Sequence, residues 1–234
     1  MTALVLVHGA WHGGWCWSRV EAHLAASGVD EVVTPTLTGL GDRRHELTSR
    51  VGLRTHVDDV TALLDAVDQP VVLVGHSYAG LVVREAADRR PDAVSRLVLV
   101  DGWAGPDGTN LLGLAPASMA DAITTAATEG DGWRIPPPDP VLVGVDDPAD
   151  ADLLRARLTH QPLLSFTEPT RLSGAVDAIP TTAVVAEPRM LPFGRFADEA
   201  GWATTAIAGG HDLMLTAPAA LAAALVRAVE PARP

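Results

Sequence analysis

The 234-residue chain contains no lysine, so all 17 of its basic residues are arginine. A lysine Schiff base, the attachment of pyridoxal phosphate and the lysine of a phosphate-binding loop are therefore excluded. Positive charge is scarce as well, because 29 acidic residues give a formal net charge of −12. Such a charge repels phosphate backbones and anionic membrane surfaces at long range. We therefore expect neither a nucleic-acid partner nor a membrane partner.

Cysteine and long apolar runs are also nearly absent. Cys16 stands alone, so it cannot form an internal disulfide or a cysteine-rich zinc site, and no oxidising compartment is required. No apolar run approaches the roughly 18 residues of a membrane span. The first residues carry no positive charge, and the apolar run at residues 3–7 is too short for a signal peptide. The sequence predicts a soluble, cytoplasmic protein.

Short β-branched runs alternate along the chain with helical patterns. The runs are apolar on both faces, which is typical of strands in a buried parallel sheet. The strong runs are residues 3–7, 70–74, 96–100 and 181–186, and weaker ones are residues 31–34 and 202–208. The helical patterns cover residues 18–27, 55–68 and 78–90 and the segment after Pro218. This alternation predicts the α/β class, with a doubly wound, mostly parallel sheet and helices on both faces.

Domains have roughly 150 residues as a soft prior, so a chain of 234 residues is more readily one larger α/β domain, residues 1–234, than two domains. Within it the alternation lapses at residues 103–176, which are rich in Gly and Pro and include three consecutive prolines. We interpret residues 103–176 as a cap insertion that covers the carboxyl edge of the sheet. Ser18 and Glu21 have the spacing of a capping box, which predicts the start of the first helix.

A serine with unusual surroundings follows the second strong run. Residues 75–80 read Gly-His-Ser-Tyr-Ala-Gly and match the pattern G-x-S-x-G. The match lies directly between a predicted strand and a predicted helix, the setting that exposes a serine on a strained turn at the sheet edge. We therefore expect Ser77 to be a nucleophile. An ordinary Gly/Ser turn at the start of a helix is the alternative.

Two further segments end at the same edge of the predicted sheet. His8-Gly9-Ala10-Trp11 follows the first strand, where a backbone N–H could join one from the residue after Ser77 as a pair of oxyanion donors. His211 follows the last strand in Gly-Gly-His-Asp, where ligands bind in open α/β sheets, and it is the best-placed base. Of the other histidines, His12 and His56 are expected at the surface or in the cap.

These three segments resemble the α/β-hydrolase superfamily, and within it the branch of plant methylesterases, hydroxynitrile lyases and bacterial esterases. The likeness covers nearly the whole chain and is weakest at residues 103–176. It implies an α/β-hydrolase fold with Ser77 as the nucleophile, His211 as the base and the backbone N–H groups of Ala10 and Tyr78 as oxyanion donors. It implies no cofactor and no metal. Hydroxynitrile lyases of this branch use a lysine after the histidine, so cyanohydrin cleavage is not expected.

The acid of the expected triad is ambiguous. Methylesterase-like members carry an aspartate shortly after the strand at residues 181–186, but here the stretch reads Ala-Glu-Pro-Arg-Met. Asp101 ends the preceding strand, where haloalkane dehalogenases of the superfamily place their acid, and we favour it over Glu187. Asp212 is interpreted as a loop residue. If neither carboxylate served, the triad would be degenerate. A reaction other than ester hydrolysis would then be expected, because a misoriented imidazole costs as much as ~10⁴ in rate in triad enzymes.

Apolar residues close to these motifs predict a hydrophobic substrate pocket. The candidates are Trp11, Trp103, Trp133 and Met214. The preferred hypothesis is a serine hydrolase, monomeric or homodimeric, that cleaves a small or medium hydrophobic ester, thioester or lactone through an acyl-enzyme. One alternative is a lyase or cyclase on the same scaffold, for example in polyketide-type metabolism, that uses His211 as a base. Another is a binding protein that has lost catalysis.

Overall fold

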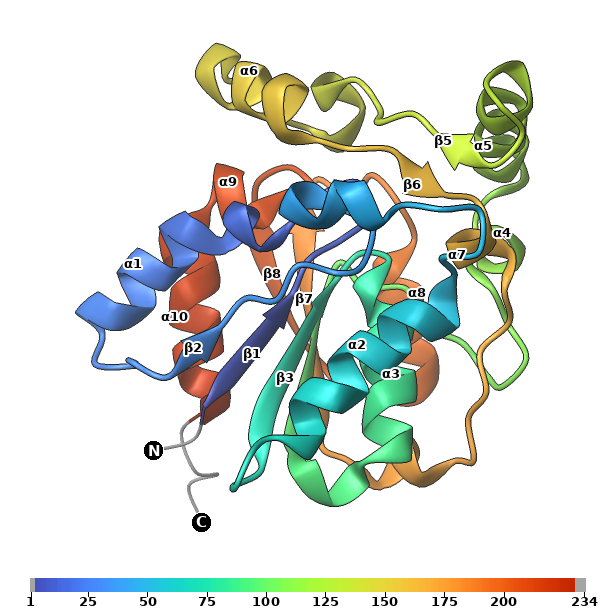
Figure 1. Ribbon diagram of the computed structural model, residues 1–234. Helices are drawn as coiled ribbons and strands as arrows, with labels where there is room; N and C mark the ends of the chain where they lie inside the picture. Colours follow the sequence, from blue (N-terminus) through green and yellow to red (C-terminus); the bar gives the residue numbers. More distant parts are fainter. Residues whose placement is uncertain (1–2, 230–234) are drawn as a thin grey trace.

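A single parallel sheet forms the centre of the molecule, whose computed structural model describes residues 3–229 (Figure 1). The strands lie in the order β2-β1-β3-β4-β7-β8, and every neighbouring pair is parallel. Their bounds are β1 Leu4–Val7, β2 Val32–Val33, β3 Val71–His76, β4 Val94–Val100, β7 Thr181–Glu187 and β8 Ala203–Ala208. The predicted domain of residues 1–234 also includes residues 1–2 and 230–234, which lie outside the described residues.

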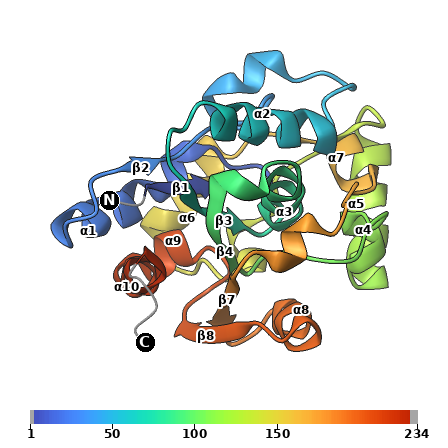
Figure 2. The same ribbon diagram turned by 90° about the horizontal axis from the view of Figure 1, so that it is seen from below.

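Helices cover both faces of this sheet, as Figure 2 shows from below. Leu4 and Leu6 of β1 pack with the helices of one face, whereas Val5 and Val7 pack with those of the other. This alternation of side chains along a strand explains why the run is apolar throughout. The first face has α1 (Ser18–Ala26) and α10 (Pro218–Val229), and the second has α2 (Leu53–Asp65), α3 (Ala79–Arg89) and α8 (Phe193–Ala200). The predicted doubly wound α/β fold is confirmed.

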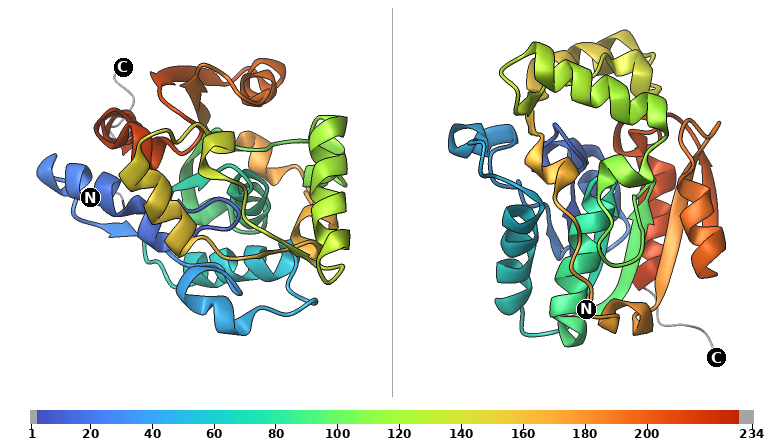
Figure 3. Two further views of the ribbon diagram at one scale, coloured as in Figure 1. Left: turned by 90° about the horizontal axis from the view of Figure 1, so that it is seen from above. Right: turned by 90° about the vertical axis from the view of Figure 1, so that its right-hand side faces the viewer.

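The larger part of the segment predicted as a cap, residues 111–167, lies over the carboxyl ends of the strands (Figures 1 and 3). Its last residues do not, because the N–H groups of Ser173 and Val176 donate to Asp88 near the end of α3, at the opposite edge of the sheet. The larger part holds a small antiparallel sheet of β5 (Arg134–Ile135) and β6 (Gln161–Pro162). Around this sheet lie α4 (Leu111–Leu114), α5 (Ala117–Glu129), the 3-10 turn η4 (Pro140–Val143), α6 (Pro148–Arg157) and α7 (Leu164–Thr167). After it the chain returns to the sheet through the 3-10 turn η5 (Ala175–Ala178). The cap therefore faces the edge where the sequence motifs converge.

Short turns connect the remaining elements. The 3-10 turns η1 (Gly14–Trp17), η2 (Gly41–Glu46) and η3 (Pro91–Ala93) precede α1, α2 and β4, and α9 (Leu213–Thr216) precedes α10. Within residues 3–229, no helix combines the length and the apolar character needed to cross a membrane.

The predicted capping box at the start of α1 is wrong. The turn η1 runs directly into α1, so Ser18 already has helical backbone angles and makes no cap hydrogen bond. A capping side chain needs an extended backbone at its own residue. Glu21 instead accepts a hydrogen bond of 3.3 Å from the Thr34 hydroxyl. The helix nevertheless begins at Ser18, as the sequence predicts.

Candidate active site

Ser77 lies on a sharp turn between β3 and α3, with a left-handed backbone at φ +52°. The turn requires both glycines of the motif. A Cβ on Gly75 would lie 2.6 Å from the Val83 side chain, and one on Gly80 would lie 2.4 Å from the Trp103 carbonyl oxygen. Ser77 itself is fixed, because its N–H donates to Val100 and its carbonyl accepts from Trp103, each at 3.0 Å. The surrounding backbone therefore keeps Ser77 in its strained conformation.

His211 reaches Ser77 from the connection between β8 and α9. Its Nε2 lies 2.9 Å from the Ser77 Oγ. The ring stacks on Phe193 with 5.1 Å between centroids, and the backbone N–H of His211 donates to the Val143 carbonyl at 2.9 Å. Both catalytic candidates are nine-tenths buried. The imidazole is therefore held in one orientation against the serine.

Asp101, and not Glu187, lies beside His211. Asp101 Oδ2 is 3.0 Å from His211 Nδ1, and Asp101 Oδ1 accepts a 2.9 Å hydrogen bond from the N–H of Ala186. The residue follows β4 with φ +43°, a left-handed conformation that turns the carboxylate toward the histidine. Glu187 is the last residue of β7, and its side chain is exposed. The structure thus brings Ser77, His211 and Asp101 into one hydrogen-bonded series.

The two backbone N–H groups predicted as oxyanion donors belong to Ala10, in the turn after β1, and to Tyr78, directly after Ser77. Neither N–H makes a hydrogen bond to another group in the part of the chain that the structure describes. Two free donors next to the serine can stabilise an oxyanion. Ala10 is also restrained from its other side, because its carbonyl accepts a 2.7 Å hydrogen bond from His12 Nδ1.

The aromatic pocket candidates divide into two groups. Trp11 packs edge-on against Phe166 of the cap, and Trp103 packs against Phe193, the residue that stacks on His211. Both tryptophans therefore lie near the site. Trp133 instead stacks with the guanidinium of its neighbour Arg134 in the cap.

Met214 is not a pocket residue. It is fully buried and packs with the residues of α1 and α10 on the opposite face of the sheet from Trp11 and Trp103. The short helix α9 turns its side chain inward, which sequence proximity to His211 could not reveal.

The structure corrects the interpretation of His12 and Asp212, which form a buried pair behind the site. His12 Nε2 lies 3.2 Å from Asp212 Oδ2, and both side chains are at least nine-tenths buried. Burial alone would lower the pKa of His12, but the Asp212 carboxylate outweighs it and raises this pKa. The pKa of Asp212 is held well below its usual range, because the attraction of His12 outweighs burial. Both pKa shifts therefore favour an imidazolium paired with a carboxylate.

Two further histidines are buried and neutral. Burial lowers the pKa of His76 well below its usual value, and its Nε2 donates to the carbonyl of His211 at 3.1 Å. Burial lowers the pKa of His56 to about 4. Its Nε2 donates to the Thr38 carbonyl at 2.9 Å, so the Tyr78 hydroxyl must donate to His56 Nδ1 at 2.8 Å.

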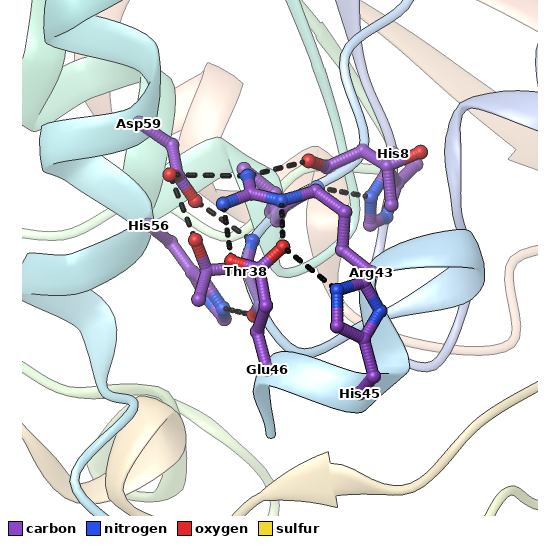
Figure 4. Close-up of polar contacts among 9 residues, drawn as sticks. His8, Thr38, Arg43, His45, Glu46, His56 and Asp59 are labelled. Atoms are coloured by element: carbon purple, nitrogen blue, oxygen red, sulfur yellow. Dashed lines mark hydrogen bonds and ion pairs between the residues drawn. The ribbon is translucent and has the colours of Figure 1, made fainter. Parts of the chain in front are cut away.

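His56 is thus a core residue, contrary to the prediction. It lies among polar groups that anchor the loop after β2 to α2, and Figure 4 shows these contacts. Asp59 accepts from the backbone and hydroxyl of Thr38 and from Arg43, which also pairs with Glu46. A signal was present, because His56, Val60 and Leu64 recur at four-residue spacing on the buried face of α2.

Among residues 3–229, one group has the spacing to hold a metal: His76, His211 and Asp212 have potential ligand atoms within 4.8 Å of one another. Both ring nitrogens of His211 are already bonded to Ser77 and Asp101, so a metal there would replace those hydrogen bonds.

None of the catalytic residues Ser77, His211 and Asp101 lines the larger cavities of the described residues. One of about 560 Å³ is lined by Arg84, Phe196 and Trp202, among others, and Ser77 is not among its lining residues.

A buried serine, histidine and aspartate in hydrogen-bond series, with two free N–H donors at the edge of a doubly wound sheet, define an enzyme of the nucleophile-elbow class. Residues 4–224 match the model of the alpha/beta hydrolase family. The chain belongs to this family, as its motifs predict.

Known proteins agree with this assignment. The chain is 33% identical to a carbendazim hydrolyzing esterase of Nocardioides sp. (strain SG-4G), over 95% of its own length and 97% of that protein. It is also 33% identical to Methylesterase 8 of Arabidopsis thaliana, over 59% of its own length and 49% of that protein. An extracellular alpha/beta-hydrolase from a Paenibacillus species has the same fold, with a TM-score of 0.86, 22% identity, and coverage of 97% of this chain and 99% of that one. The predicted class, a carboxylic ester hydrolase-like enzyme, is confirmed.

Proposed function

We propose that this protein hydrolyses uncharged, hydrophobic carboxylic esters through an acyl-enzyme on Ser77. The observation that carries the proposal is the continuous series from the Ser77 hydroxyl through His211 to Asp101, with hydrogen bonds of 2.9 and 3.0 Å. This arrangement activates a serine hydroxyl, which is a weak nucleophile on its own.

Each residue has a defined task in the proposed reaction. His211 Nε2 takes the proton of the Ser77 hydroxyl while Oγ attacks the ester carbonyl carbon. Asp101 accepts the hydrogen bond from Nδ1 and thereby fixes the tautomer that leaves Nε2 free to accept the proton. The N–H groups of Ala10 and Tyr78 stabilise the oxyanion of the tetrahedral intermediate.

Collapse of this intermediate breaks the bond to the alkoxy group, which leaves as an alcohol with the proton from His211. Water then attacks the acyl-enzyme with His211 as its base, and the carboxylic acid product is released while Ser77 regains its proton. The same two steps would cleave a thioester or a lactone.

The surroundings of Ser77 support a hydrophobic substrate. Trp11, Phe166 and Tyr78 pack together, and Trp103 packs against Phe193, which stacks on His211. The net charge of −12 disfavours an anionic substrate. A relative named for carbendazim hydrolysis and others named as methylesterases agree with an ester of small alcohol portion and hydrophobic acyl portion.

A lyase or cyclase that uses His211 as its base is the alternative considered above. Its motive was the missing aspartate after β7, and the hydrogen bond between Asp101 and His211 supports hydrolysis instead. No feature of the described residues favours it over hydrolysis.

Intact mass after incubation with a fluorophosphonate probe tests the proposal. We expect one probe per chain in the wild type and none in Ser77→Ala, together with hydrolysis of p-nitrophenyl butyrate by the wild type alone. Far-UV circular dichroism of both proteins controls for folding. A folded wild type that stays unlabelled and leaves the ester intact would contradict the proposal in favour of a lyase, cyclase or binding role.

A further inference from the structure

Trp11 has a strained backbone next to a proposed oxyanion donor. Its φ is +64°, and a bulky residue adopts this left-handed region only where its surroundings enforce it. Trp11 follows Ala10 directly, so the conformation of Trp11 sets the path of the chain through the oxyanion loop, residues 8–11. The groups that hold Trp11 therefore restrain Ala10 from its carbonyl side, and through the backbone angles of Ala10 they limit where its N–H can point.

The cap supplies those groups. The N–H of Trp11 donates to Gln161 Oε1 at 2.9 Å, and the carbonyl of Trp11 accepts from the N–H of Thr159 at 2.9 Å. The indole Nε1 donates to the carbonyl of Ile135 at 3.2 Å. Ile135 and Gln161 are paired residues of β5 and β6, so one small sheet holds both the backbone and the ring of Trp11.

Gln161 is oriented for this contact. Its side chain is fully buried, and its Nε2 donates to the Ser165 hydroxyl at 2.7 Å, which in turn donates to the Pro162 carbonyl at 2.6 Å. Because Ser165 uses its proton for Pro162, it must accept from the amide group of Gln161. The amide oxygen is then the atom that faces Trp11.

The peptide between Ala10 and Trp11 is consequently held at both ends. From the sheet side, His12 donates to the Ala10 carbonyl at 2.7 Å. From the cap side, Gln161 accepts from the Trp11 N–H. We propose that Gln161 is a positioning residue through which the seated cap sets the oxyanion loop, an inference that rests on the function proposed above. When the β5–β6 sheet moves away, for example as substrate enters, Trp11 is released. The Ala10 N–H then leaves its position in the oxyanion hole until the cap closes again.

Substitutions at Gln161 test this coupling. Gln161→Met has a similar volume and removes the acceptor, whereas Gln161→Glu, which burial keeps protonated, retains an oxygen for the Trp11 N–H and an O–H that donates to Ser165. Loss of a whole oxyanion donor typically costs ~10²–10³ in kcat. A displaced donor should cost less, so we expect kcat of Gln161→Met for p-nitrophenyl butyrate to fall about 10- to 100-fold with KM within about twofold. Gln161→Glu should recover most of kcat.

The matched control is Asp147→Ala, which weakens the cap without touching Trp11. Asp147 caps α6 by accepting from the N–H groups of Ala149 and Asp150, each at 3.0 Å. We expect Asp147→Ala to keep kcat within about twofold. The affinity for phenylboronic acid, which forms a tetrahedral adduct with an activated serine, should fall in Gln161→Met by the same factor as kcat. Equal kcat in Gln161→Met and the wild type, or an equal loss in Asp147→Ala, would overturn the inference.

Hydrogen exchange separates failure of this inference from failure of the proposed function. If the wild type neither reacts with the fluorophosphonate nor cleaves the ester, the proposed function fails. The coupling is then decided by the backbone amide of Trp11, whose exchange should be at least about tenfold faster in Gln161→Met than in the wild type because its acceptor is lost. Unchanged exchange at Trp11 would overturn the coupling whatever the activity.

Discussion

Three residues carry strain at the site. Trp11, Ser77 and Asp101 are the non-glycine residues with positive φ among residues 3–229, and they follow β1, β3 and β4 at one edge of the sheet. A left-handed conformation costs roughly 1–2 kcal/mol per residue, and such strain tends to gather where function requires a fixed geometry. The three residues hold the oxyanion loop, the nucleophile and the acid in the orientations that the proposed reaction needs.

Asp212 gives a prediction at the same scale. Asp212→Leu leaves His12 buried without its counter-ion, and breaking a buried pair in this way costs about 3–5 kcal/mol. Asp212→Asn should cost clearly less, because a neutral His12 still donates to Ala10 and accepts from the new amide group. Urea denaturation of both variants and the wild type checks this order. Equal losses in the two variants would contradict the pairing.

Most elements of the sheet could be predicted from the sequence. The run at residues 70–74 overlaps β3, and the run at residues 96–100 lies within β4. Both could be predicted because continuous runs of β-branched residues are typical of strands buried on both faces. The strands β5 and β6 went unpredicted, since strands of two residues each show no periodicity. They form only because residues far apart in the sequence pair inside the cap.

The site was predictable in its motifs and not in its supporting contacts. Ser77 and His211 follow from local patterns at strand ends. The choice between Asp101 and Glu187 depends on a backbone turn after β4, which is a property of the folded sheet edge. The buried pair of His12 and Asp212 joins the loops after β1 and β8 and has no local signal.

Buried histidines make the stability of the whole molecule depend on pH. Burial lowers the pKa of His8 to about 3 and of His56 to about 4, and that of His76 well below its usual value. The unfolded chain, with histidine pKa values near 6.5, therefore binds more protons than the folded chain below about pH 6.5. The stability contributed by these neutral groups is complete above that pH and is lost as the pH falls toward their folded values.

We expect His8 and His56 each to lower the free energy of unfolding by about 2 kcal/mol between pH 7 and pH 5, and His76 to act in the same direction. Urea denaturation at the two pH values measures the change. His56→Gln should show a smaller difference than the wild type, whereas the control His23→Gln, at an exposed position of α1, should keep the full difference. A His56→Gln variant with an undiminished pH dependence would contradict the assignment.

The central claim is that Asp101 completes a triad with His211 and Ser77. These three residues follow β4, β8 and β3, so the triad joins distant parts of the chain at one edge of the sheet. The most direct measurement is kcat for p-nitrophenyl butyrate in Asp101→Asn beside Glu187→Gln. Loss of the orienting acid costs as much as ~10⁴ in kcat in triad enzymes. The predicted result is a fall of about 10³–10⁴ in Asp101→Asn and a change within about twofold in Glu187→Gln. Near-normal turnover in Asp101→Asn, or an equal loss in Glu187→Gln, would contradict it.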